Sequence, residues 1–123
     1  MRLSRLALLT TVATALSGGC ANPTDERAAD FATIVTGILR PGCATAHCHD
    51  AMTAVEGLDF STLATAGASI DRLVPIGGTP SPDETQLMNV LTTDGEERMP
   101  LDSPLPDADL ELIRTWIVAG AVH

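Results

Sequence analysis

The chain has 123 residues, a formal net charge of −9, 45% hydrophobic residues and only 2% aromatic residues. This length provides for one domain. The acidic balance and the absence of lysine exclude a basic nucleic-acid-binding surface, and the charge by itself indicates no more than good solubility.

The first twenty residues have the pattern of an export signal. Arg2 and Arg5 form a short basic region, the apolar stretch 6–16 follows, and small residues precede Cys20. This order is that of a signal peptide, and the apolar stretch is too short for a transmembrane helix. We therefore expect residues 1–19 to be a signal peptide and the protein to be exported.

Two processing sites are open. The sequence "LSGGC" resembles a bacterial lipoprotein signal, which would make Cys20 the lipidated first residue and anchor the protein to a membrane, facing the periplasm. Cleavage after "ATA" (13–15) would instead give a soluble periplasmic protein. Lipidation of Cys20 leaves Cys43 and Cys48 as a pair without a leftover thiol. Without the signal peptide, five basic residues face sixteen acidic ones, a net charge of −11.

Residues 20–30 are expected to form a short tether before the domain. Within it, residues 21–26 are expected to contain a helix start, with Thr24 as the N-cap. Apolar residues then recur at helical spacing: Phe31, Ile34, Val35 and Ile38. Pro41-Gly42 is expected to stop this helix just before Cys43. A loop should follow, to about residue 54.

A short helix is expected after Ser61, followed by an irregular connection over 73–82 that is rich in Pro and Gly. Ser81 and Glu84 have the spacing of a capping box, with a proline at the first helical position. This pattern predicts a helix from Ser81 to about residue 91.

A long loop is expected over 92–106, and such loops in compact domains are usually functional. The last predicted helix begins near Asp107 and ends at Gly120. Its apolar face is expected to contain Leu110, Ile113, Trp116 and Ile117. No segment alternates polar and apolar residues as a strand does, so we expect a small all-α domain with long loops.

The stretch "CATAHCH" places Cys43, Cys48 and His49 close together, and three interpretations are open. A disulfide is common in an exported protein, but it leaves His49 unexplained. Zinc could use Cys43, His47, Cys48 and His49, but structural zinc sites take ligand pairs from separate segments. Covalent haem attachment needs two thiols and a histidine directly after the second. The usual motif is C-x-x-C-H, and here the cysteines are two residues farther apart, so the extra residues would have to bulge outward.

Residues 31–121 resemble the single-haem c-type cytochrome domain found in many bacterial envelope lipoproteins. The resemblance rests on three segments in order: "ILRPGCATAHCH", "ERMP" and "DLELIRTWIVAGA". It implies a cytochrome c-like domain over 31–123 that binds one covalent haem c. By this resemblance, Cys43 and Cys48 form the thioethers, and His49 and Met99 are the axial ligands of the iron.

The residues themselves favour Met99 over the other methionines. Met52 lies three residues after His49, a span of about 10 Å when fully extended, too short to round a porphyrin. Met88 falls in a predicted helix, where a core role is expected. Met99 has ample reach from the long loop, although it could also simply anchor that loop to the core.

The function expected from the resemblance is one-electron transfer with a redox partner protein in the cell envelope, with the membrane reached through the lipid anchor. A buried porphyrin would also compensate for the shortage of aromatic residues, which are only Phe31, Phe60 and Trp116. We find no catalytic constellation in the sequence. Two alternatives remain: a disulfide-stapled lipoprotein that binds or scaffolds, and a haem-bearing accessory domain of a redox enzyme.

Overall fold

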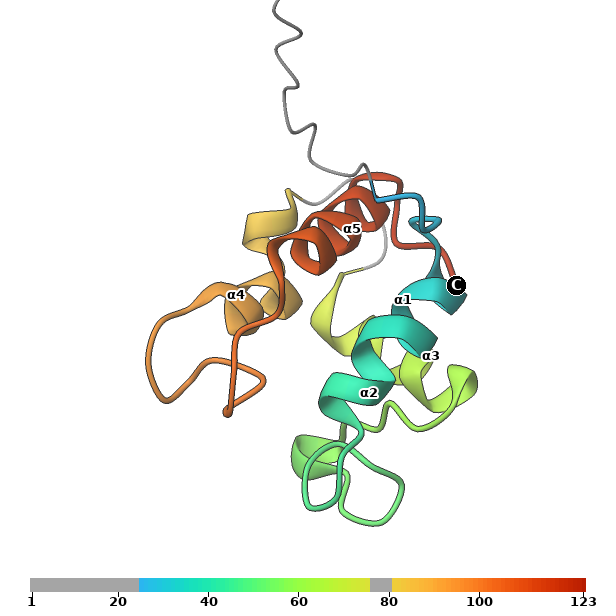
Figure 1. The fold of residues 1–123 in the computed structure, drawn as a ribbon. Helices are drawn as coiled ribbons and strands as arrows, with labels where there is room; N and C mark the ends of the chain where they lie inside the picture. Colours follow the sequence, from blue (N-terminus) through green and yellow to red (C-terminus); the bar gives the residue numbers. More distant parts are fainter. Residues whose placement is uncertain (1–24, 76–80) are drawn as a thin grey trace, which may run out of the picture.

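The computed structural model describes residues 25–75 and 81–123, and all regular structure within these two ranges is helical (Figure 1). The segments are α1 (Phe31–Ile34), the π-helical turn η1 (Val35–Leu39), α2 (Arg40–Cys43), the 3-10 turn η2 (Val55–Gly57), α3 (Leu63–Leu73), the 3-10 turn η3 (Pro82–Glu84), α4 (Gln86–Thr92) and α5 (Asp107–Val118). The expected all-α class is confirmed for the described residues. The predicted signal peptide (1–19), Cys20 and Thr24 lie outside them.

The segments α1, η1 and α2 form one continuous helix, because the residues that join them keep right-handed helical backbone angles. This helix begins at Phe31, where the carboxylate of Asp30 accepts the backbone N–H of Thr33 at 2.8 Å. Residues 25–30 are not helical, so the predicted start just after Thr24 is wrong. The N-cap is Asp30, the residue directly before the apolar series that begins at Phe31.

The prediction that Pro41-Gly42 stops this helix is also wrong, because the helix continues to Cys43. A proline ring inside an α-helix clashes with the carbonyl four residues earlier. Here the preceding turn is wider, since the N–H of Arg40 donates to the carbonyl of Val35, five residues back. The wider turn leaves room for Pro41, and the first thiol is therefore held on a helical turn.

The short helix expected after Ser61 is confirmed as α3. Its N-cap is Thr62, whose hydroxyl accepts the N–H of Thr65 at 3.2 Å, while the Thr65 hydroxyl accepts the N–H of Thr62 at 3.3 Å. This reciprocal pair is a capping box. The inner face of α3 buries Ala66, Ile70 and Leu73.

The helix predicted from Ser81 to residue 91 is divided into η3 and α4. Ser81 makes no capping bond through its side chain. Thr85, which is fully buried, accepts the N–H of Met88 at 3.2 Å with its hydroxyl and donates to the carbonyl of Pro82 at 2.7 Å. The true N-cap of α4 is therefore Thr85, and the assignment of Ser81 as its cap is wrong.

The last helix begins at Asp107, as predicted, after an irregular loop over 93–106. Gly120, which follows it, has a φ of +106°, a conformation that favours glycine beyond a helix end. The buried residues of α5 are Leu112, Ile113, Trp116 and Ile117. Leu110, which was expected to face inward, is only partly buried, and Leu112 is the additional core residue.

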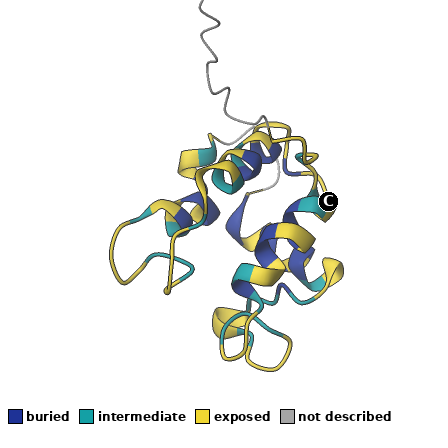
Figure 2. Ribbon diagram, in the orientation of Figure 1, coloured by how far each residue is buried: buried dark blue, intermediate teal, exposed yellow. Residues whose placement is uncertain are grey.

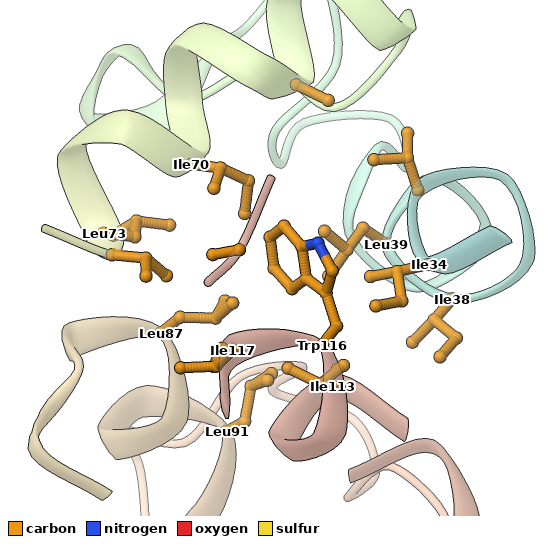
Figure 3. Packing of buried hydrophobic residues seen from close by; sticks show 14 of the residues in the cluster. Ile34, Ile38, Leu39, Ile70, Leu73, Leu87, Leu91, Ile113, Trp116 and Ile117 are labelled. Atoms are coloured by element: carbon orange, nitrogen blue, oxygen red, sulfur yellow. The ribbon is translucent and has the colours of Figure 1, made fainter. Parts of the chain in front are cut away.

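The helices pack around one core of aliphatic side chains. Figure 3 shows the ring of Trp116 between Ile70 of α3 and the first helix, with Ile34 and Leu39. The indole N–H donates to the carbonyl of Val122 at 3.1 Å, so the buried polar atom of Trp116 has a partner. Buried residues cover the inner faces of the helices (Figure 2).

Two long loop segments, 44–62 (which contains η2) and 93–106, connect the helices. In Figure 1 the first lies at the bottom of the view and the second at the lower left, beside α4. They contain most of the residues that the sequence identifies as candidates for a site. Within residues 25–75 and 81–123, no helix combines the length and the apolar composition that a membrane span requires.

Candidate functional site

The Cys–His loop, which we define as residues 43–49, starts at the last turn of the first helix and folds back on itself. The backbone N–H of His49 donates to the carbonyl of Cys43 at 3.0 Å. Residues 45–47, which lie between the two cysteines, are exposed. The wider spacing of Cys43 and Cys48 is therefore accommodated without separating the first thiol from the histidine.

His49 is held in one orientation by contacts on both sides of its ring. Its Nδ1 lies 3.0 Å from the carbonyl oxygen of Val55, and because a carbonyl only accepts, Nδ1 carries the hydrogen. The ring meets that of Phe60 edge to face, with centroids 5.8 Å apart and an interplanar angle of 80°. In the neutral ring this tautomer leaves the lone pair on Nε2, the form in which a histidine binds a metal.

Met99 is fixed in the loop 93–106 by its own backbone. Its N–H donates to the carbonyl of Val90 in α4 at 2.7 Å, and its peptide bond to Pro100 is cis. A side chain at Gly42 would come within 3.8 Å of both Pro100 and Leu105, so this loop lies against the end of the first helix. The methionine and the Cys–His loop are therefore neighbours.

Two cavities adjoin this meeting point, and Cys43, His49 and Met99 line both of them. The larger has a volume of about 590 Å³, and its other lining residues are Pro41, Gly42, further residues of the Cys–His loop, Val55 and residues 100–106. Such a volume lies within the range of roughly 300–1,000 Å³ typical of sites for small molecules and cofactors. The smaller, of about 230 Å³, borders the core and is lined mainly by Leu39, Leu58, Phe60, Leu73, Leu87 and Leu91.

The other two methionines in the described residues lie elsewhere. Met88 is fully buried in the core and lines neither cavity. Met52 is 96% exposed and also lines neither. Among the described methionines, only Met99 shares a cavity with His49.

The two thiols of the Cys–His loop are not joined by a disulfide. Burial, followed by the nearby charge of Cys48, raises the pKa of Cys43 to about 11. A thiol with this pKa is almost fully protonated near neutral pH, and the thiolate is the form that attacks another sulfur. The structure therefore gives no support to the disulfide interpretation.

The zinc interpretation requires several donor side chains to converge on one point. In the part of the chain that the structure describes, no three histidine, cysteine, aspartate or glutamate side chains form such a group. His47 has a φ of +70° and lies in the exposed part of the Cys–His loop. The donor side chains that the sequence suggests for zinc do not converge on one point, as a tetrahedral zinc site requires.

Sequence reasoning missed several residues of the site. Phe60, which contacts the imidazole, and Leu105, which lines the larger cavity, come from segments that carry no motif. Phe60 could have been singled out as one of only three aromatic residues. Arg72 of α3 lines the smaller cavity, and no signal in the sequence pointed to it.

The residues of this site fit the haem that the sequence predicts. The donor set comprises two free thiols, an imidazole with its Nε2 available and a thioether sulfur, and the cavities between them are mostly apolar. Comparisons of the chain with protein-family models, with curated proteins and with solved structures found no match.

Proposed function

We propose that this chain is an electron-transfer protein of the cell envelope that binds one covalent haem of the c type. In this proposal, Cys43 and Cys48 form the thioether bonds, and His49 and Met99 are the axial ligands of the iron. The observation that supports it most directly is that Cys43, His49 and Met99 line the same two cavities, although Met99 is fifty residues from His49.

When bound, haem supplies one-electron chemistry between the two oxidation states of its iron. The protein would hold the iron of the haem through the side chains of His49 and Met99. The hydrogen bond from His49 Nδ1 to Val55 makes the imidazole more electron-donating at Nε2. A thioether such as that of Met99 favours the reduced iron and raises the reduction potential. If His49 and Met99 both held the iron, no position on it would be open for a substrate, which would suit electron transfer.

The proposal includes export and lipidation at Cys20, with the protein anchored to a membrane and facing the periplasm. A soluble periplasmic form, produced by cleavage after residue 15, is the alternative. The partner would be another redox protein of the envelope. A single acyl chain anchors a protein only weakly, so stable anchoring depends on the several chains that a lipoprotein cysteine carries.

The test is a spectroscopic redox titration of the full-length protein, produced in a host that attaches haem to exported proteins. We expect a purified protein with the absorption bands of a low-spin c-type haem and a reversible titration that fits one electron per chain. The reduced form should not bind carbon monoxide, because Met99 occupies the sixth position.

Other outcomes would contradict the proposal in distinguishable ways. A colourless protein from such a host would support the binding or scaffolding lipoprotein. A haem protein that binds carbon monoxide readily would support an accessory domain of a redox enzyme, with Met99 not bound to iron. As a control, Met52→Leu should leave the titration unchanged, because Met52 is exposed and lines neither cavity.

A further inference from the structure

Arg72, near the end of α3, is a cation with unused hydrogen-bonding capacity beside the smaller cavity. Its Nη1 donates to the carbonyl of Gly57 at 3.0 Å. A guanidinium has five N–H groups, so four remain for other partners. No carboxylate pairs with Arg72 in the described residues, whereas Arg27 and Arg114 are each paired with aspartates.

The charge of Arg72 is unusual for its surroundings. It is the only arginine among the described residues that line either cavity, and the chain has no lysine. Most of the smaller cavity is apolar, and apart from Arg72 its polar lining residues are His49, Glu56 and Gln86. An anion that entered this cavity would therefore find one permanent positive charge, that of Arg72.

The two cysteines indicate which edge of a haem would face Arg72. This step rests on the proposed function. The vinyl groups that react with thiols and the two carboxylates of haem lie on opposite edges of the ring. Cys48 lines only the larger cavity and Arg72 only the smaller one, while Cys43 lines both. The edge bonded to sulfur would therefore face the larger cavity, and the carboxylate edge would face the smaller.

We infer that Arg72 binds a carboxylate of the haem through a charge-assisted hydrogen bond. Such bonds are shorter and stronger than those between neutral groups, and an arginine can grip a carboxylate with two parallel N–H groups. The bond from Arg72 to Gly57 orients the guanidinium before the cofactor arrives. The positive charge also offsets that of Glu56 in the same lining.

The test compares Arg72→Gln and Arg72→Lys with Arg114→Gln in the full-length, haem-loaded protein. Arg114→Gln removes the same charge from a residue that is paired with Asp83 and lines neither cavity. The readout is the resonance Raman band for bending of the haem carboxylate side chains, which responds to hydrogen bonds at those groups. The midpoint potential is measured in parallel.

We expect Arg72→Gln to move this band to lower wavenumber and to lower the midpoint potential, because a nearby cation disfavours the oxidised iron. Arg72→Lys should restore most of the potential, and Arg114→Gln should leave the band unchanged. An unchanged band in both Arg72 variants, with haem still bound, would overturn the inference and leave the proposed function intact. A wild-type protein without haem would overturn both.

Discussion

The smaller cavity allows the stability of the haem-free protein to be estimated. Without a cofactor, 230 Å³ of mostly apolar space remains beside the core. An enclosed void in a core costs about 24 cal/mol per Å³, so this cavity, which is partly open to solvent, costs at most about 5.5 kcal/mol. Domains of this size have a net stability of about 5–15 kcal/mol. We therefore predict that the haem-free domain is close to unfolding.

The perturbation is the double variant Cys43→Ser, Cys48→Ser, which cannot form thioether bonds. Because a serine at the buried position of Cys43 adds a cost of its own, the matched control is the wild-type sequence produced in a host that does not attach haem. Far-UV circular dichroism during heating is the assay, with haem content measured on the same samples. Both haem-free samples should lack a cooperative transition or melt far below the haem-loaded protein.

A sharp transition in both haem-free samples, close to that of the loaded protein, would refute this reasoning. It would mean that the cavity closes or hydrates at little cost, and that the aliphatic core around Trp116 is sufficient by itself. A sharp transition in the wild-type sample alone would assign the loss to the serine substitutions rather than to the missing cofactor.

Three other predictions concern single residues. Met99→His should lower the midpoint potential markedly, whereas Met88→Leu should barely change it, because Met88 lines neither cavity. Loss of the sulfur-to-iron charge-transfer band in the Met88 variant alone would contradict the assignment of Met99 as an iron ligand. Thr85→Ala should lower the free energy of unfolding of the haem-loaded protein by about 1 kcal/mol, because α4 loses its N-cap. Ser81→Ala should change this free energy by less than about 0.5 kcal/mol. Equal effects of the two variants in denaturant titrations would contradict the assignment of Thr85 as the N-cap. The wild-type protein should incorporate labelled palmitate in a bacterial host and Cys20→Ala should not; a soluble wild-type product that starts at Leu16 would show that the other processing site is used.

Much of the helical pattern could be predicted from the sequence, because apolar spacing and caps are local signals. The start of α5 at Asp107 and the helix after Ser61 are examples. One incorrect prediction, the N-cap of α4, arose because two nearby residues are both suitable for that position. Ser81 and Thr85 are both good N-caps, and the burial of Thr85 by tertiary packing decides between them.

The end of the first helix illustrates a second kind of error. Pro41 is a helix breaker by local chemistry, and only the wider turn before it makes the helix continue to Cys43. The local sequence pattern contains no signal that predicts the π-helical turn η1. For the site, the motif residues could be selected from the sequence, and the scarcity of aromatic residues was a weak signal for Phe60. Arg72 could not be selected, because only the fold brings it to the smaller cavity.

The most direct test of the central claim is whether haem is bonded to the polypeptide through Cys43 and Cys48. The full-length protein, made in a host that attaches haem to exported proteins, is denatured and extracted with acidified organic solvent, and the polypeptide is then weighed by mass spectrometry. We expect the colour to stay with the polypeptide and the mass of the polypeptide to exceed that of the mature chain by one haem. The double variant Cys43→Ser, Cys48→Ser should abolish both. Haem that passes entirely into the solvent, or a colourless wild-type chain, would contradict the central claim.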